Sequence, residues 1–141
     1  MVLKIMQPAS SSCFSLEYNE AKCSIGEATL IHTNCIDESE GIEATFQRYE
    51  RRNIRTDNPS FHMSVNPAPG ENLSEDQVKE FIGEVMSGLG YGSQPYVIYQ
   101  HTDIDRVHYH VVSVRVNDQG RKIHDFQENK RCFQLISAVA P

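Results

Sequence analysis

The chain has 141 residues, of which 39% are hydrophobic and 23% charged, a composition typical of one soluble globular domain. No apolar run approaches the roughly 20 residues that span a bilayer, and the N-terminus lacks the apolar stretch and cleavage site of a signal peptide. With 13 basic and 19 acidic residues the net charge is −6, which by itself argues against a nucleic-acid partner, although net charge says little about local patches.

The cysteines are the next global feature. Four of them lie far apart in the sequence without a C-x-x-C pair: Cys13, Cys23, Cys35 and Cys132. This spacing predicts free thiols in a reducing cytoplasm, and it favours neither a disulfide framework nor a zinc knuckle.

The first half of the chain contains four predicted elements. Residues 2–6 are expected to form a short strand, and residues 14–22 a helix that ends near Gly26. Residues 28–31 are a weaker strand candidate. A second helix is expected over residues 39–52, where apolar side chains recur at i, i+4 and i+7.

The middle of the chain has the clearest local signals. Residues 61–66 alternate between apolar and polar side chains, as a half-buried strand does. Ser74 and Gln77 then form a capping box, and apolar residues follow at helical spacing to position 89. Gly88 and Gly90 are expected to stop this helix.

The last third begins with two predicted strands, over residues 96–101 and 107–117. Residues 118–120 have turn chemistry, so residues 121–124 are expected to return as a hairpin partner. This order of elements predicts an α+β fold, an antiparallel sheet with helices packed on it. The stretch 128–141 ends without a cap, and we expect the chain to be one domain cut from a longer protein.

Three histidines form the main chemical motif. His108 and His110 are two residues apart on a predicted strand, so their side chains project to the same face about 6–7 Å apart. His101 ends the preceding strand, where an antiparallel neighbour could place it beside them. Three imidazoles with open positions are typical of a catalytic metal site, and Asp103 and Asp105 could orient their N–H groups. Two histidines on one strand are often only surface residues, so spacing alone leaves both interpretations open.

Several segments together resemble the relaxase/mobilization-protein family, the HUH endonucleases named for a His–hydrophobic–His motif. The matching segments are residues 61–67 (Phe-His-Met-Ser-Val-Asn-Pro), 73–75, 88–90, 96–103 and 108–110. Residues 114–123 also resemble the family's Asn-Arg-Val…Asp-Gly-Lys segment, with Val114 in place of the Asn. The resemblance covers residues 58–124 well and residues 14–30 more loosely.

The resemblance implies a function as well as a fold. It implies that His101, His108 and His110 bind a divalent cation, Mg²⁺ or Mn²⁺, which polarises a scissile phosphate. A tyrosine would attack this phosphate and leave a 5′-phosphotyrosine and a free 3′-OH. The implied role is the nicking of single-stranded DNA at a transfer origin, which starts mobilisation of a plasmid or transposon in the bacterial cytoplasm, together with accessory mobilisation proteins.

The family's nucleophile lies near the N-terminus, in a motif like Leu-x-Tyr-x-x-x-Lys, and residues 16–22 fit it. Tyr18 is therefore the expected nucleophile; the alternative is an ordinary helix tyrosine packed against the sheet. Four other tyrosines are expected to be buried or to flank the core: Tyr49, Tyr96, Tyr99 and Tyr109.

The remaining polar residues give weaker predictions. His62 shares a strand face with Ser64 and is interpreted as structural or substrate-flanking, whereas His32 and His124 are expected to be exposed. Candidate DNA contacts are the basic residues in or beside family-like segments and in the densest basic cluster: Lys22, Arg48, Arg51, Arg115, Arg121 and Lys122.

Two rival functions remain open. A catalytically inactive relaxase-like module that only holds DNA would fit the acidic charge and the expected truncation. An HUH transposase or replication initiator is the other rival, but transposases of this type place the tyrosine after the histidines, and Tyr18 precedes them.

Overall fold

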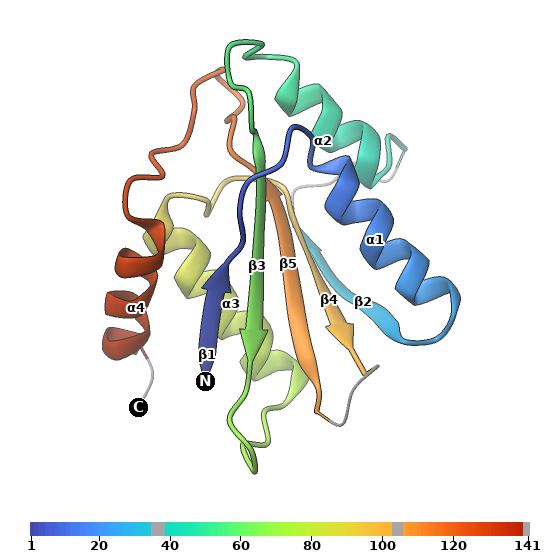
Figure 1. Ribbon diagram of the computed structural model, residues 1–141, viewed down its shortest axis with the longest axis vertical. Coiled ribbons are helices and arrows are strands. Elements are labelled where there is room, and N and C mark those ends of the chain that lie inside the picture. The colour runs from blue at the N-terminus through green and yellow to red at the C-terminus, as the bar shows by residue number, and fades with distance from the viewer. Residues whose placement is uncertain (35–38, 103–105, 140–141) are drawn as a thin grey trace.

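The computed structural model describes residues 1–34, 39–102 and 106–139, and within them five strands form one sheet (Figure 1). Neighbouring strands are all antiparallel, in the order β1-β3-β5-β4-β2, which places β5 at the centre. The strands are β1 (Val2–Ile5), β2 (Ala28–Asn34), β3 (Ser60–Asn66), β4 (Tyr96–His101) and β5 (His108–Val114).

Four helices cover the sheet on both faces. They are α1 (Cys13–Ser24), α2 (Ile42–Glu50), α3 (Glu75–Leu89) and α4 (Glu128–Val139). Figure 1 shows α1 and α2 in front of the sheet, α3 behind it and α4 beside β1. The predicted α+β class is confirmed. Among the described helices none has the length and apolarity required to cross a membrane.

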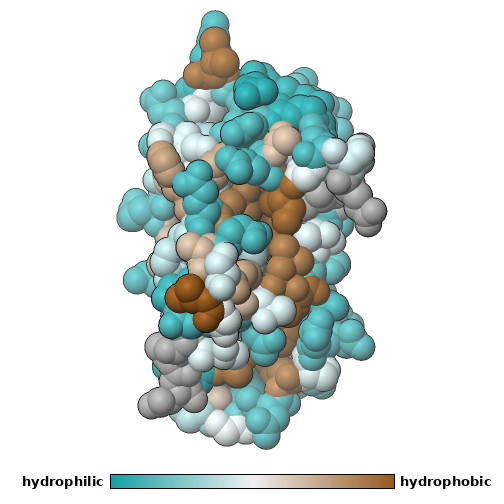
Figure 2. Space-filling view, turned by 90° about the vertical axis from the view of Figure 1, so that its right-hand side faces the viewer, coloured by the Kyte–Doolittle hydropathy of each residue, from teal (hydrophilic) through white to brown (hydrophobic). Residues whose placement is uncertain are grey.

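The two faces of the sheet carry different side chains. The face toward α3 and α4 is the larger core, to which β5 contributes Tyr109 and Val111. The face toward α1 is a smaller apolar cluster that includes Val112 from β5. Because side chains alternate along a strand, His108 and His110 share the α1 face with Val112. Figure 2 shows the side of the molecule that bears α1 and the β2 edge. This side is hydrophilic over much of its area, and a band of apolar side chains runs along it.

Helix α3 confirms its predicted start. The Ser74 hydroxyl accepts from the Gln77 amide, and the Gln77 side chain accepts from the Ser74 amide. Gly90 ends the helix in the left-handed conformation with φ of 99°. Gly88 is not a stop, because it lies inside α3. A Cβ there would lie 2.6 Å from a methyl carbon of Leu135, so the glycine lets α4 pack closely on α3.

Other sequence predictions need correction. Helix α2 begins at Ile42, three residues later than expected. Residues 121–124 form no strand but only the single bridge between Val116 and Lys122, and α4 was not anticipated. His32 is half-buried against Tyr96 rather than exposed, with 5.8 Å between the ring centroids, because β2 pairs with β4.

For the other histidine, tyrosine and cysteine residues named next, the structure agrees with the sequence predictions. His124 is exposed. The four tyrosines expected to be buried are buried: Tyr49, Tyr96, Tyr99 and Tyr109. The free cysteines in the described part of the chain are Cys13, Cys23 and Cys132, and Cys35 lies outside it.

Candidate functional site

The β4–β5 hairpin brings three histidines together on the α1 face of the sheet. His101 and His108 are direct partners across the hairpin, and His110 lies two residues further along β5. The ring centroid of His101 lies 4.2 Å from that of His110 and 5.1 Å from that of His108. The expected cluster therefore forms, from a contact between neighbouring strands.

The cluster has the donor set of an open metal site. One ring nitrogen from each histidine lies within 4.8 Å of the others. Two nitrogens bound to one ion at about 2.0–2.2 Å lie at most about 4.4 Å apart, so small ring rotations suffice. His101 is fully buried and His110 is 8% exposed. Neutral imidazole is a common ligand of first-row transition ions, whereas Mg²⁺ prefers oxygen ligands.

Asn19 on α1 fixes the orientation of His101. Its side chain is fully buried, and its Oδ1 lies 2.6 Å from Nε2 of His101. The amide orientation follows from the network, because Nδ2 of Asn19 donates to the Ser15 carbonyl at 2.8 Å. Oδ1 can only accept, so Nε2 of His101 carries the proton and Nδ1 is the nitrogen suited to bind a metal. Sequence analysis missed Asn19, although it follows Tyr18 directly.

His62 lies on β3, which flanks β5 on the side opposite β4, and it contacts the cluster through His110. Its Nε2 lies 2.7 Å from Nδ1 of His110, which leaves Nε2 of His110 as the ligand atom. Burial, aided by the nearby His101, lowers the pKa of His62 to about 4 and keeps the ring neutral near pH 7. The sequence predicted which side chains share the face of β3 with His62. It did not predict the contact between His62 and His110, which are diagonal neighbours across the β3–β5 pairing.

Tyr18 lies over the histidine cluster. Its ring centroid is 6.2 Å from that of His101, in a stacked arrangement, and 6.3 Å from that of His110. Tyr18 is 50% exposed, so the residue is open to a substrate from solvent. Two anchors set the rotation of α1 beneath it: the Asn19 bond, and a 2.8 Å bond that the Tyr99 hydroxyl donates to Glu20.

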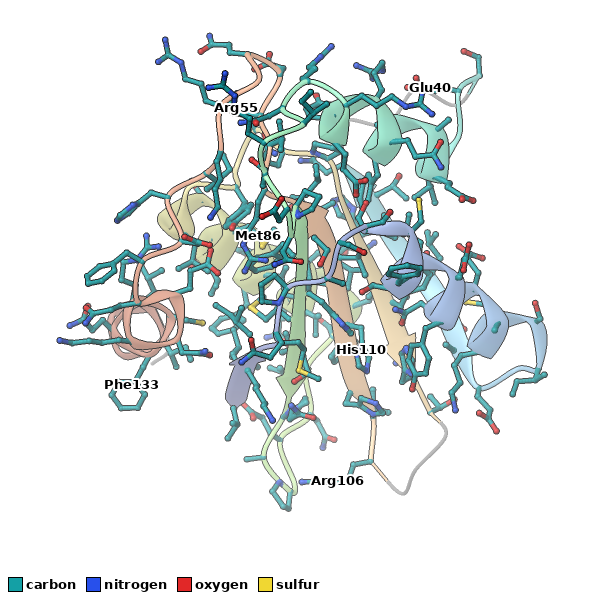
Figure 3. All side chains as sticks on the ribbon, turned by 45° about the horizontal axis from the view of Figure 1, so that its top comes forward. Glu40, Arg55, Met86, Arg106, His110 and Phe133 are labelled. Atoms are coloured by element: carbon teal, nitrogen blue, oxygen red, sulfur yellow. The ribbon has the colours of Figure 1, made fainter. Side chains whose placement is uncertain are left out.

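The basic residues predicted to contact DNA are spread over the molecule. Lys22 lies nearest to the site, with Nζ 5.8 Å from the Tyr18 ring centroid and 3.0 Å from a Glu27 carboxylate oxygen. Arg48 on α2 pairs with Glu40 at 2.9 Å. Figure 3 shows Glu40 at the end of the molecule away from His110. The other exposed candidates are Arg51, Arg121 and Lys122.

Arg115 is the exception among these candidates, because it is only 2% exposed. Its guanidinium bonds to a Glu128 carboxylate oxygen at 2.6 Å and to the Ser60 carbonyl, and Glu128 also accepts from the Tyr91 hydroxyl at 2.6 Å. This network attaches α4 to the sheet. Arg115 is thus an interior residue, and the prediction that it contacts DNA is corrected. Asp103 and Asp105, predicted to orient the histidines, lie outside the described residues.

Residues 18–139 match the family described as "Relaxase: MobA/VirD2-like, nuclease domain". The chain belongs to the relaxase family. Protein TraI of Escherichia coli is 24% identical over 81 residues, a segment that covers 57% of this chain and 11% of TraI. The relaxase described here thus corresponds to a small part of that relative, and its predicted origin from a longer protein stays a prediction. No solved structure matches it.

Proposed function

We propose that this relaxase chain cuts one DNA strand at a specific site in a transfer origin and keeps the cut end as a 5′-phosphotyrosine, which starts mobilisation of a plasmid or transposon. The observation that carries the proposal is the position of Tyr18. Its half-exposed ring lies against His101 and His110, in a chain of a nuclease family. A nucleophile and a candidate cation site therefore share one surface.

The proposed metal ligands are Nδ1 of His101, Nε2 of His110 and a ring nitrogen of His108. Three neutral ligands would leave the full positive charge of a divalent ion, Mn²⁺ or Mg²⁺, uncompensated by the protein. When bound, the ion polarises the scissile phosphate and stabilises the charge that develops on its oxygens. Asn19 and His62 hold two of the rings in the tautomers that this arrangement requires.

In the proposed reaction the Tyr18 oxygen attacks phosphorus. The bond from oxygen to phosphorus forms, the bond from phosphorus to the 3′ oxygen breaks, and the proton of the phenol passes to solvent, which half-exposed Tyr18 contacts. The departing 3′ oxygen takes up a proton and becomes a free 3′-OH. One phosphodiester replaces another, so the strand can be rejoined later. Lys22, with Nζ 5.8 Å from the Tyr18 ring centroid, is the proposed phosphate contact.

The test uses a random single-stranded DNA library, because the nick site is unknown. The relaxase is incubated with the library and Mn²⁺, and covalent protein–DNA adducts are detected on denaturing gels. We expect adducts with wild type and none with Tyr18→Phe, although both bind Mn²⁺ in calorimetry. Tyr109→Phe is the matched control, since Tyr109 lies between His108 and His110 but faces α3, and it should still form adducts.

The outcomes separate the rivals. Adducts with Tyr18→Phe would contradict the assignment of the nucleophile. Mn²⁺ binding and DNA binding without any adduct would favour the catalytically inactive module. A His108→Ala/His110→Ala variant that binds Mn²⁺ as wild type does would reject the proposed metal centre. The order of tyrosine before histidines supports a relaxase over a transposase.

A further inference from the structure

A shallow hollow of about 340 Å³ lies directly beside Tyr18 and the histidine cluster. Its lining comes from the residue that follows β1 and from α1, β3 and β5: Met6, Phe14, Ser15, Tyr18, His62 and His110. The hollow is continuous with the proposed catalytic surface, because three of its lining residues belong to that surface. Whatever occupies it lies next to the phosphate that Tyr18 would attack.

Phe14 is the unusual residue of this hollow. It is 59% exposed and belongs to none of the three apolar clusters found among the described residues. It precedes Tyr18 by four residues on α1, so both rings lie on the same helix face about 6 Å apart along the axis. An exposed aromatic ring gains little from the fold, but it offers a flat surface to a ligand.

The charge of the chain makes such a surface useful for single-stranded DNA. Proteins that hold single strands combine phosphate attraction with stacking of bases on aromatic side chains. Lys22, the predicted DNA contact nearest to the site, pairs with the Glu27 carboxylate at 3.0 Å, which offsets its attraction for phosphates, so stacking is expected to supply a larger share of the binding there.

We propose that the hollow is a base-binding subsite, in which the nucleobase adjoining the scissile phosphate stacks on Phe14. Met6 also lines the hollow, and its polarisable thioether is of a kind that makes favourable contacts with aromatic edges. The sugar of one nucleotide spans the step from a phosphate at Tyr18 to a base on Phe14. This subsite rests on the proposed function, and stacking imposes little base preference, so the subsite positions the strand rather than selecting the sequence.

The test exploits the absence of tryptophan from the chain. A Phe14→Trp substitution keeps an aromatic platform and adds a single fluorophore at the hollow. The Tyr18→Phe background and a chelator prevent nicking, so the measurement reports binding alone. The probe is a mixed-sequence single-stranded oligonucleotide at low salt. We expect saturable quenching of the indole emission of the Phe14→Trp variant, since an indole stacked on a base is quenched.

Two controls isolate stacking. Phe133→Trp places the same fluorophore on α4, where Phe133 is 71% exposed and points away from the molecule on the side opposite α1 (Figure 3), and it should not be quenched. An abasic strand of equal length keeps the phosphates but lacks bases, and it should not quench Phe14→Trp. In an otherwise wild-type chain, Phe14→Ala should weaken oligonucleotide binding roughly 5- to 100-fold, and Phe133→Ala should leave it unchanged.

Equal quenching at the two positions, equal quenching by the abasic strand, or unchanged binding by Phe14→Ala would each overturn the subsite. A protein ligand in place of DNA would give no quenching by any oligonucleotide, and this result also rejects the proposal. The outcome is separate from that for nicking. If bases stack on Phe14 in a chain that never forms adducts, the subsite stands and the catalytic proposal is refuted. If the wild type forms adducts and Phe14→Ala binds the oligonucleotide as tightly as wild type does, the catalytic proposal stands and the subsite is refuted.

Discussion

Asn19 joins helix α1 to His101, so replacing it by leucine tests whether the fold sets the orientation of this ligand in advance. The substitution keeps a branched side chain with the same number of heavy atoms but removes Oδ1, the acceptor that lies 2.6 Å from Nε2 of His101. His101 is fully buried, so water cannot easily replace the lost partner. We expect two consequences, a weaker metal site and a less stable fold.

The magnitudes follow from the burial of both partners. Leaving a buried donor unsatisfied costs about 1–3 kcal/mol, which lowers the melting temperature of a chain of this size by several degrees. Removing a hydrogen-bond partner of a metal-bound histidine usually weakens metal binding about 10- to 100-fold. The two effects have the same origin, because the ring that loses its partner can rotate away from the position that the metal requires.

The assay is Mn²⁺ titration by calorimetry, together with thermal unfolding in a chelator. Asn19→Asp keeps the acceptor, so its Mn²⁺ affinity should stay within a few-fold of wild type. Gln94→Leu controls for general destabilisation. Gln94 is 3% exposed and donates to the carbonyls of Val114 and Val116, at the end of β5 opposite His108. This variant should lose stability without losing Mn²⁺ affinity.

The reasoning fails if Asn19→Leu binds Mn²⁺ as tightly as wild type while remaining folded. It also fails if Gln94→Leu weakens Mn²⁺ binding as much as Asn19→Leu does, since the effect would then come from a loosened fold. Only a loss confined to Asn19→Leu and restored in Asn19→Asp supports the specific hydrogen bond.

Two further predictions concern stability away from the site. Burial, followed by the charge of Glu128, raises the pKa of the Cys132 thiol to about 11. Between pH 9 and 11 the unfolded chain has released this proton and the folded chain has not, so the free energy of unfolding should fall by about 1–3 kcal/mol over this range. Chemical denaturation of the Cys132→Ala variant should lack this part of the pH dependence. A pH profile identical to that of wild type would reject the assignment. Arg115→Met should destabilise the fold by about 3–5 kcal/mol in urea denaturation, because it leaves Glu128 as a buried charge without a counter-ion. Adding Glu128→Leu should recover part of the lost stability. A double variant as unstable as Arg115→Met would contradict this account.

Local patterns predicted most of the fold. The capping box at Ser74 marked the start of α3, and alternation marked β3, because each depends on residues within one or two turns. The histidine cluster could be predicted from the sequence for the same reason. His101 and His108 belong to one hairpin, so strand pairing alone brings them together. These predictions required no knowledge of how helices pack on the sheet.

The parts that the sequence did not predict depend on contacts between distant segments. Asn19 and His101 are 82 positions apart, and no local pattern distinguishes this asparagine from an exposed one. Arg115 was predicted to contact DNA because it is a basic residue in a family-like segment, whereas its partner Glu128 lies on α4, an element missed in the sequence. Gly88 resembled a helix stop until the approach of Leu135 showed its packing role.

Some of the acidic residues that lower the net charge, which argued against a DNA partner, take part in contacts of this kind. Glu50 accepts from the Ser12 amide at 2.6 Å, at the start of α1. Glu20 accepts from Tyr99 and fixes the rotation of that helix, and Glu128 neutralises Arg115 in the interior. Glu50 and Glu20 therefore support α1, the helix that presents Tyr18, and Glu128 supports the attachment of α4 to the sheet. Net charge counts them as though they faced the substrate, and for this reason it is a poor guide to what a single strand would meet at the histidine cluster.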